Sequence, residues 1–258
     1  MAWLEGLIEH APLWLIGILL FGLLMLSVRI GVWLRTRGKH TDSRTDDEGY
    51  LLSAALALLG LLIAFTFSLA LNRYDSRRDF VVQEANAIGT AWLRAGLVEG
   101  KAGQSLQQGI AHYADVRLEL PASVSEAETA RIDVLSGRLQ SQLWQEMKTD
   151  IATLPAPIAT TLITAMNEMF DVASARKAER QARIPVDVLT VLILCTAMSA
   201  AIIGYVLGST GKSHRTVTII LFALLTLALL MILDLDRPWR GAITVSQQPM
   251  LDMRAGLR

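Results

Sequence analysis

The chain has 258 residues, of which 52% are hydrophobic, and its 24 basic and 24 acidic residues give a formal net charge of zero. This balance argues against nucleic acid as a partner and against a strongly acidic substrate. The charges lie almost entirely outside four apolar stretches, a separation typical of an integral membrane protein.

Four apolar stretches are long enough to cross a bilayer, which requires about 20 residues in a helix. They lie at residues 11–34, 50–71, 186–207 and 216–233. The first exceeds the apolar part of a signal peptide and ends on Arg29 instead of a small-residue cleavage site, so we expect it to be retained. The sequence therefore predicts four transmembrane helices, with the lipid bilayer as the first partner.

Basic residues near the spans favour two opposite orientations. The short loops carry Arg35, Arg37 and Lys212 among others, whereas residues 1–10 carry no lysine or arginine, which places these loops in the cytoplasm. The flanks of the long segment between the second and third spans are also basic and favour the reverse. The side of the membrane that holds this insert is left open.

The insert at residues 73–184 is predicted to be helical throughout. Neither glycine nor proline occurs in residues 72–79, at the polar end of the second span, so span and insert are expected to share one helix that runs to about Arg94. Gly96 and the glycines after it end this helix. A shorter helix then runs to about Leu120 and is closed by Pro121.

Two further helices are predicted in the insert. The first begins with a capping-box pattern at residues 123–126 and ends at Pro155 and Pro157. The second starts at Ile158 and carries a charged stretch at residues 176–183 before the third span. Apolar residues recur at helical spacing in both: Ile132, Leu135, Leu139, Leu143, Met147 and Ile151 in the first, and Leu162, Met166, Met169 and Val172 in the second.

The predicted fold is an all-α integral membrane protein, with four transmembrane helices and a helical extramembrane bundle inserted between helices 2 and 3. Its expected divisions are transmembrane helices 1 and 2 at 1–72, the insert at 73–184, transmembrane helices 3 and 4 at 185–234, and a C-terminal tail at the membrane interface at 235–258. The tail contains Trp239, which is typical of the interfacial belt.

A polar stripe follows the second helix beyond the membrane, at steps of three and four residues. The same register inside the bilayer is apolar. Repeated around a symmetry axis, such a face would form a hydrophobic neck and a hydrated vestibule. Alternatively, the stripe faces water or hydrogen-bonds at a bundle interface. The neck residues are Leu62, Phe65 and Leu69, and the vestibule residues are Asn72, Ser76, Asp79, Gln83, Asn86 and Thr90.

Charges gather where the insert meets the membrane, and they predict a charged collar. One interpretation is ion attraction or gating. The other is anchoring by acid-base pairs that fix the insert on the membrane helices. Arg29 lies elsewhere, inside the first apolar segment, and is expected to snorkel or to pair with Asp47 or Glu48. The collar consists of Arg73, Asp75, Arg77, Asp187, Asp234, Asp236 and Arg237.

Signatures of enzymes and metal sites are missing from the sequence. The four histidines are scattered singly, and the single cysteine, Cys195, lies within the third span, so no metal site is predicted. Residues 208–213 resemble the end of a phosphate-binding loop, but they join two membrane helices instead of a strand and a helix. We therefore expect no catalytic residue and no cofactor, and the protein is not predicted to be an enzyme.

Two runs of residues resemble a known family. Residues 65–78, continued by 82–94, and residues 236–250 are similar to bacterial membrane proteins grouped as bestrophin-like domain proteins. The resemblance implies a multi-pass protein of the bacterial inner membrane. By analogy with bestrophins, it also implies a homo-oligomeric ion channel, a pentamer with the second helix lining the pore and the insert in the cytoplasm. The calcium-clasp motif of bestrophins is not matched residue by residue.

The sequence thus supports two hypotheses of function. The first is a homo-oligomeric channel for small inorganic ions. The alternative is a non-conducting membrane scaffold or envelope sensor whose helical insert binds a partner protein. In the first the polar stripe lines a pore, and in the second it is buried as a packing seam.

Overall fold

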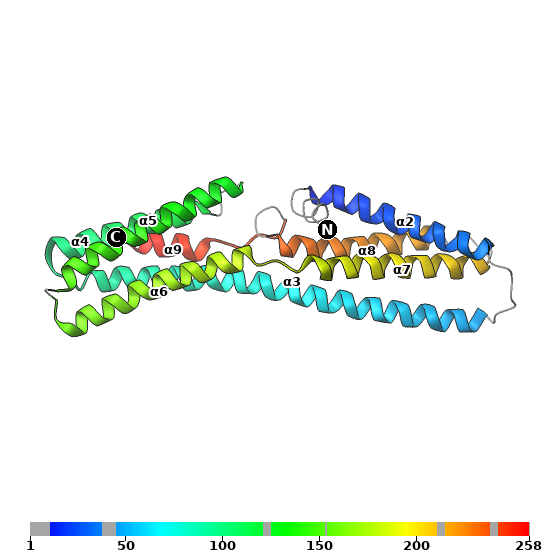
Figure 1. The fold of residues 1–258 in the computed structure, drawn as a ribbon, viewed down its shortest axis with the longest axis horizontal. Coiled ribbons are helices and arrows are strands. Elements are labelled where there is room, and N and C mark those ends of the chain that lie inside the picture. The colour runs from blue at the N-terminus through cyan, green and yellow to red at the C-terminus, as the bar shows by residue number, and fades with distance from the viewer. Residues whose placement is uncertain are drawn as a thin grey trace. The chain divides into compact units, whose positions relative to one another are not determined.

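The computed structural model describes residues 11–37, 45–120, 125–152, 154–210, 215–237 and 242–257. All regular structure in these ranges is helical, which confirms the predicted fold class (Figure 1). The helices are α2 (Leu13–Arg37), α3 (Thr45–Ala95), α4 (Gly100–Leu118), α5 (Glu126–Ile151), α6 (Ala156–Gln181), α7 (Val186–Thr210), α8 (Arg215–Asp236) and α9 (Gln248–Gly256).

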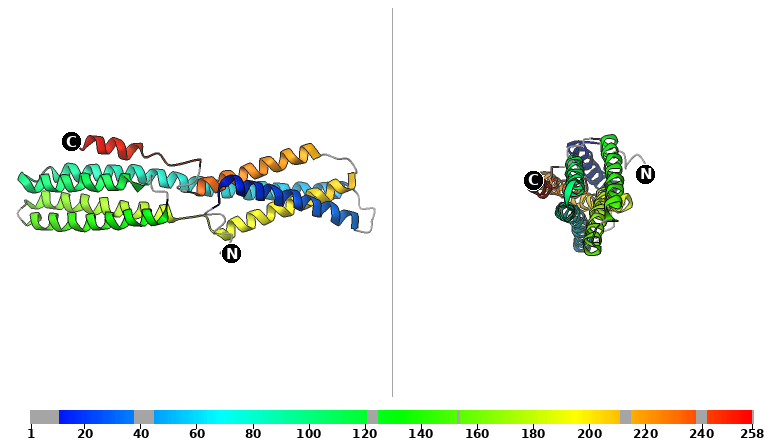
Figure 2. Two further views of the ribbon diagram at one scale, coloured as in Figure 1. Left: turned by 90° about the horizontal axis from the view of Figure 1, so that it is seen from above. Right: turned by 90° about the vertical axis from the view of Figure 1, so that its left-hand side faces the viewer.

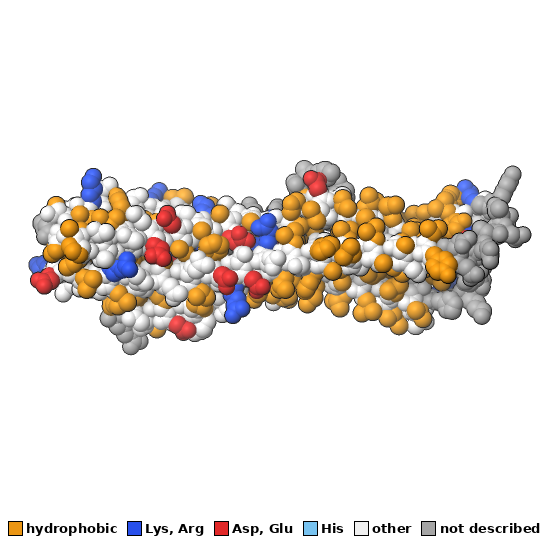
Figure 3. Space-filling model, turned by 90° about the horizontal axis from the view of Figure 1, so that it is seen from below, with side chains coloured by type: hydrophobic (Ala, Val, Ile, Leu, Met, Phe, Trp, Pro, Cys, Tyr) orange, Lys and Arg blue, Asp and Glu red, His pale blue; other side chains and the backbone are white. Residues whose placement is uncertain are grey.

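The chain forms two compact units. The membrane unit comprises residues 1–73 and 183–243, and the insert unit comprises residues 74–182 and 244–258. Four helical segments of the described chain are long and apolar enough to cross a membrane: Leu13–Arg37, Glu48–Ala95, Ala156–Gly208 and Arg215–Asp236. The first begins two residues after the start of its predicted span, and each of the other three contains its predicted span entirely. Apolar side chains cover the membrane unit on the face shown in Figure 3, whereas charged side chains gather on the insert unit.

Two glycines let α2 and α7 approach each other closely in the membrane unit. A Cβ atom on Gly31 would lie 1.9 Å from the carbonyl oxygen of Ala201, and one on Gly204 would lie 2.1 Å from that of Val28. Small residues at a crossing of membrane helices allow this backbone contact. The hydrophobic core of this unit includes Leu24 of α2 and Phe222 of α8.

Helix α3 is continuous from the second span into the insert, as predicted. It has 51 residues and ends at Ala95, one residue before Gly96. Its apolar membrane-spanning part is the least buried of the four, since 17% of its residues are buried, compared with 33% in each of the other three. Much of the surface of α3 is therefore free to contact lipid or another subunit.

The insert unit is a helical bundle that also contains α9. Helix α4 packs against α5 and α9, and α5 packs against α6 (Figure 2). The predicted apolar faces are confirmed, because Ile132, Leu143 and Met147 of α5 are buried, as are Met166 and Met169 of α6. Met250 and Leu257 of the C-terminal segment complete the same core.

The capping of α5 differs from the prediction. Its N-cap is Ser125, whose Oγ accepts a hydrogen bond of 3.2 Å from the backbone N–H of Glu128. The expected capping-box start, Ser123, lies outside the described residues, as does Pro121. The sequence contains two overlapping capping-box patterns, Ser123 to Glu126 and Ser125 to Glu128, and local spacing does not distinguish between them.

Candidate functional site

The predicted neck residues lie on the side of α3 that the rest of the membrane unit leaves open. Phe65 is 66% exposed and Leu69 is 37% exposed, whereas Leu62 is half-buried. The opposite side of this stretch contains the buried Leu59, Thr66 and Ala70. The apolar part of the stripe is thus directed away from the core of its own unit.

The vestibule residues continue along the same helix. Asn72, Asp79, Gln83 and Asn86 are exposed, and Ser76 and Thr90 are half-buried. The other side of α3 in the insert unit enters the hydrophobic core and contains Val81, Ala85, Ile88, Ala91 and Ala95. The predicted register therefore separates an outward polar face from an inward apolar face within the insert unit.

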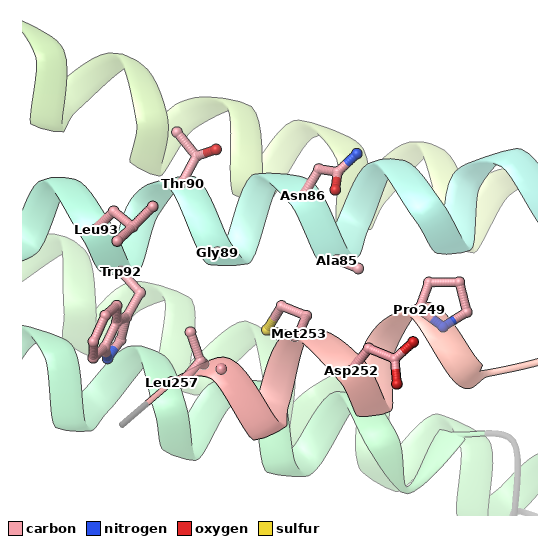
Figure 4. Close-up of a pocket in the computed structure, with 11 residues that line it drawn as sticks. Ala85, Asn86, Gly89, Thr90, Trp92, Leu93, Pro249, Asp252, Met253 and Leu257 are labelled. Carbon is pink, nitrogen blue, oxygen red and sulfur yellow. The ribbon is translucent and has the colours of Figure 1, made fainter.

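A hollow of about 560 Å³ opens between α3 and α9, beside the polar stripe (Figure 4). Asn86 and Thr90 line it from α3, and Asp252 and Met253 line it from α9. Gly89 sits between the two stripe residues, and a Cβ atom there would lie 3.6 Å from Met253 Cγ. The C-terminal helix α9, which belongs to the predicted tail, therefore borders the predicted vestibule surface.

A buried carboxylate fixes the inward side of α3. Glu84 is fully buried, and its Oε1 accepts a hydrogen bond of 2.5 Å from Arg117 Nε of α4. Its Oε2 accepts a hydrogen bond from Arg176 Nη1 of α6. Arg176 Nη2 also donates a hydrogen bond of 2.8 Å to Gln247 Oε1, just before α9. One carboxylate thus joins three helices, and the chain leading to α9 is tied to them.

A second carboxylate, Asp133 of α5, lies beside this group. Arg180 Nη2 donates a hydrogen bond of 2.6 Å to Asp133 Oδ2, and Lys177 Nζ lies 3.4 Å from the same oxygen. Arg117 Nη1 lies 3.9 Å from Asp133 Oδ1. Because buried charges are tolerated when they are paired, these contacts allow a charged network inside the bundle.

Tyr113 lies one helical turn before Arg117 and is completely buried. Its hydroxyl accepts a hydrogen bond of 3.0 Å from Gln140 Nε2. Burial raises the pKa of the Tyr113 phenol to about 12, because the charged phenolate is disfavoured away from water. The tyrosine therefore stays neutral at physiological pH.

Two collar carboxylates are buried and hold backbone groups of the membrane unit. Asp234 accepts hydrogen bonds from the N–H groups of Ala242 at 2.9 Å and Ile243 at 3.0 Å. Asp236 Oδ1 accepts one of 2.9 Å from the N–H of Ile184. These acids thus fix the chain that enters α7 and the chain that leaves α8.

The collar arginines behave similarly. Arg237 Nη1 donates a hydrogen bond of 2.9 Å to the carbonyl of Ala11 in the membrane unit. In the insert unit, Arg77 Nη2 donates one of 2.9 Å to the carbonyl of Ala182, at the end of α6. The other collar residues have more solvent access: Arg73 is half-buried, and Asp75 and Asp187 are exposed.

At the other end of the membrane unit, Glu48 pairs with Arg35, a partner that the sequence analysis did not consider. Arg35 Cζ also lies 4.9 Å from the centre of the Tyr205 ring. Arg29 is exposed on α2, and the side chain of Asp47 lies outside the described structure. Glu48, one of the two partners considered for Arg29, thus pairs instead with an arginine six residues further along α2.

The buried network was missed in the sequence. Arg176 and Arg180 stand in a charged stretch that looks like a solvated face, and Glu84 lies beside the polar stripe. Their only signal is that each falls at a helical spacing from buried apolar neighbours, as Glu84 does from Ile88 and Arg176 from Ala173. In the described part of the chain, no group of three or more histidine, cysteine, aspartate and glutamate residues could hold a metal ion.

Comparison with known proteins identifies related sequences and folds. The family model for the bestrophin-like domain matches residues 19–250. Crystal structures of mutants of a bacterial bestrophin homolog from Klebsiella pneumoniae share the fold. One is 13% identical with a TM-score of 0.65, covering 92% of this chain and 98% of that chain. Another is 13% identical with a TM-score of 0.67, covering 95% and 99%. A search of curated proteins found no match.

Proposed function

Because the chain belongs to the bestrophin-like domain family, whose members are generally membrane proteins without enzymatic activity, we propose that it is a homo-oligomeric ion channel with α3 lining the pore. The observation that carries this proposal is the open face of α3. That face is apolar within the second span and mostly neutral and polar in the insert unit. The proposed location is a bacterial inner membrane, and the proposed assembly is a pentamer by analogy with bestrophins.

The neck would consist of large apolar side chains that point away from their own subunit. Phe65, at 66% exposed, is the most prominent of the three, and Leu62 and Leu69 flank it by one helical turn. In a ring of copies around α3, these side chains would face a common axis. A narrow apolar constriction gates ions by excluding water.

The vestibule would be lined by amides, hydroxyls and a single carboxylate, that of Asp79. Neutral polar groups keep a passage hydrated without binding ions so tightly that they cannot leave. Glu84, by contrast, is turned inward and neutralised by arginines, so it contributes structure and not a binding site for permeant ions.

The collar would act in two ways. Asp75 and Asp187 are exposed and could attract ions in the assembled channel. Asp234 and Asp236 are engaged with backbone N–H groups, so their proposed role is to anchor the chain between the membrane helices.

The first test is the oligomeric mass of the purified protein in detergent, followed by ion flux after reconstitution into liposomes. We expect a symmetric oligomer with ion-selective flux, and a higher basal flux for the double variant Phe65→Ala and Leu69→Ala, because smaller side chains leave the neck wetted. Leu71→Ala is the matched control, since Leu71 is also exposed on α3 but lies on a different side of the helix.

Unchanged flux in a correctly assembled Phe65→Ala, Leu69→Ala protein would remove the neck assignment. A monomer or dimer without flux would instead support a non-conducting scaffold or envelope sensor. In that case Gln83→Leu or Asn86→Leu should disrupt binding of a partner protein or assembly, whereas in the channel these changes should alter flux and leave the oligomer intact.

A further inference from the structure

The outward face of α2 carries two arginines and a tryptophan near its C-terminal end. Arg29, Trp33 and Arg37 follow one another at spacings of four residues, and all three are exposed. Residues four apart lie on the same side of a helix. The opposite side of this stretch contains the buried Gly31, which packs on α7. The three residues stand among exposed aliphatic side chains: Leu26, Ile30 and Leu34.

Trp33 contacts one of the two arginines. Arg37 Cζ lies 4.3 Å from the centre of the Trp33 ring. Side chains of a helix lean toward its N-terminus, so the Arg37 guanidinium reaches back along α2 to the Trp33 ring. The backbone of Arg29 lies about 6 Å from that of Trp33 along the helix axis, toward the N-terminus, at a rise of about 1.5 Å per residue. One guanidinium is thus stacked on the ring, and the second arginine stands one turn before it on the same side of the helix.

Arg29 has no hydrogen bond or ion pair within the described structure, unlike Arg35, which is engaged with Glu48. A guanidinium on an apolar membrane surface is costly unless it finds an anion or water. Its planar fork matches the oxygens of a phosphate group, and tryptophan favours the depth of lipid headgroups.

We propose that Arg29, Trp33 and Arg37 bind the phosphate of an anionic phospholipid. The surrounding aliphatic side chains favour a lipid over free phosphate, because acyl chains can cover them. The sequence beyond α2 continues with Lys39 and Arg44, which adds to the attraction of an anionic leaflet. This site depends on the membrane span and is independent of whether the protein conducts ions.

The test is native mass spectrometry of the full-length protein, titrated with phosphatidylglycerol or with phosphatidylcholine. We expect the wild type to retain phosphatidylglycerol preferentially. Arg29→Gln and Arg37→Gln should each weaken that retention about fivefold, from the usual contribution of one basic residue near an anionic surface. Arg138→Gln is the matched control, since Arg138 is an exposed arginine of the insert unit.

Two further variants test the site if the Arg29→Gln, Arg37→Gln double variant fails to fold. Arg29→Lys with Arg37→Lys keeps both charges and loses the planar forks, so its retention should be intermediate. Trp33→Leu keeps an apolar side chain and removes the ring under Arg37, so it should also weaken binding.

Three results would overturn the proposal. One is equal retention of phosphatidylglycerol by the wild type and by a folded Arg29→Gln, Arg37→Gln protein. Another is an equal loss in Arg138→Gln, which would show that only overall charge matters. The third is displacement of the lipid by an equimolar amount of inorganic phosphate, which would indicate a site for the free anion.

Discussion

Arg117 Nε donates a hydrogen bond of 2.5 Å to Glu84 Oε1, and neither side chain is more than 3% exposed. The two residues come from α4 and from the inward side of α3, the helix whose outward side carries the proposed pore surface. The pair therefore fixes the rotation of α3 about its own axis within the insert unit, and with it the direction of Gln83 and Asn86.

Replacing Glu84 by Gln should strongly destabilise the insert unit. The change leaves Arg117 and Arg176 buried without their carboxylate, and breaking a buried pair in this way costs about 3–5 kcal/mol. The measurement is the thermal unfolding of the purified protein in detergent. Glu119→Gln is the control, because Glu119 forms an exposed pair with Arg131 and should change stability by less than about 1 kcal/mol. Similar losses in both variants would contradict a special role for Glu84.

Replacing Gly204 by Ala should disrupt the membrane unit. The added methyl group would lie 2.1 Å from a backbone oxygen of α2, so the two helices must separate, at a cost of about 1–3 kcal/mol or more. Gly22→Ala is the control, since a Cβ atom there would have no neighbour within 4 Å. Yield of folded protein and its melting temperature should fall for Gly204→Ala alone, and equal behaviour of the two variants would show that α2 and α7 are not closely packed.

The phenol of Tyr113 should titrate apart from an exposed tyrosine. Its pKa is raised to about 12 by burial, so the folded state resists the loss of this proton. The stability that results is fully present below the ordinary pKa of about 10 and is lost as the pH rises from about 10 to about 12. The measurement is phenolate absorbance against pH in the wild type and in Tyr113→Phe. The part of the absorbance change that is absent from the variant should be the part that appears at the highest pH. A missing component near pH 10 would mean that Tyr113 is solvated.

The attachment of α9 should weaken in acid. Arg254 donates hydrogen bonds of 2.5 and 3.0 Å to Asp115, which hold the pKa of that carboxyl below its usual value. The contribution of the pair is present above the ordinary pKa of about 3.9 and is lost as the pH falls through the lowered value. Both side chains are partly exposed, so the effect should stay below about 1 kcal/mol.

Hydrogen exchange of residues 248–257, corrected for intrinsic rates, is the measurement for this pair. At neutral pH, the Asp115→Asn variant should show the reduced protection that the wild type shows only in acid. Gln248 also donates a hydrogen bond to Asp252 within α9. Asp252→Asn is therefore the control for a local change in that helix, and this variant should keep the pH dependence of the wild type.

Much of the fold could be predicted because its signals are local. The four spans follow from the length of the apolar runs, and the continuity of α3 beyond the membrane follows from the lack of glycine and proline in residues 72–79. The buried face of α5 follows from the spacing of Ile132, Leu139 and Leu143. The outward direction of Phe65 and Asn86 agrees with the predicted stripe, whereas their place in a pore stays a prediction.

The parts that could not be predicted depend on partners far apart in the chain. Glu84 lies 33 residues from Arg117 and 92 residues from Arg176, and no periodicity indicates that these three charges meet. Likewise, no local pattern in the predicted C-terminal tail, residues 235–258, indicates that Met250 is completely buried in the core of the insert unit. Pairing of charges and docking of short helices are decided by tertiary contacts that local patterns do not encode.

The insert unit is built from two pieces of chain, 74–182 and 244–258, separated by the 61 residues of α7, α8 and their connections. The core of this unit therefore cannot be completed during synthesis until Met250 and Leu257 leave the ribosome, roughly 3–15 s after Ala182 at common elongation rates. In that interval the apolar positions that these side chains cover stay open while two membrane helices are inserted. The insert unit can therefore be completed only after α7 and α8 have been synthesised.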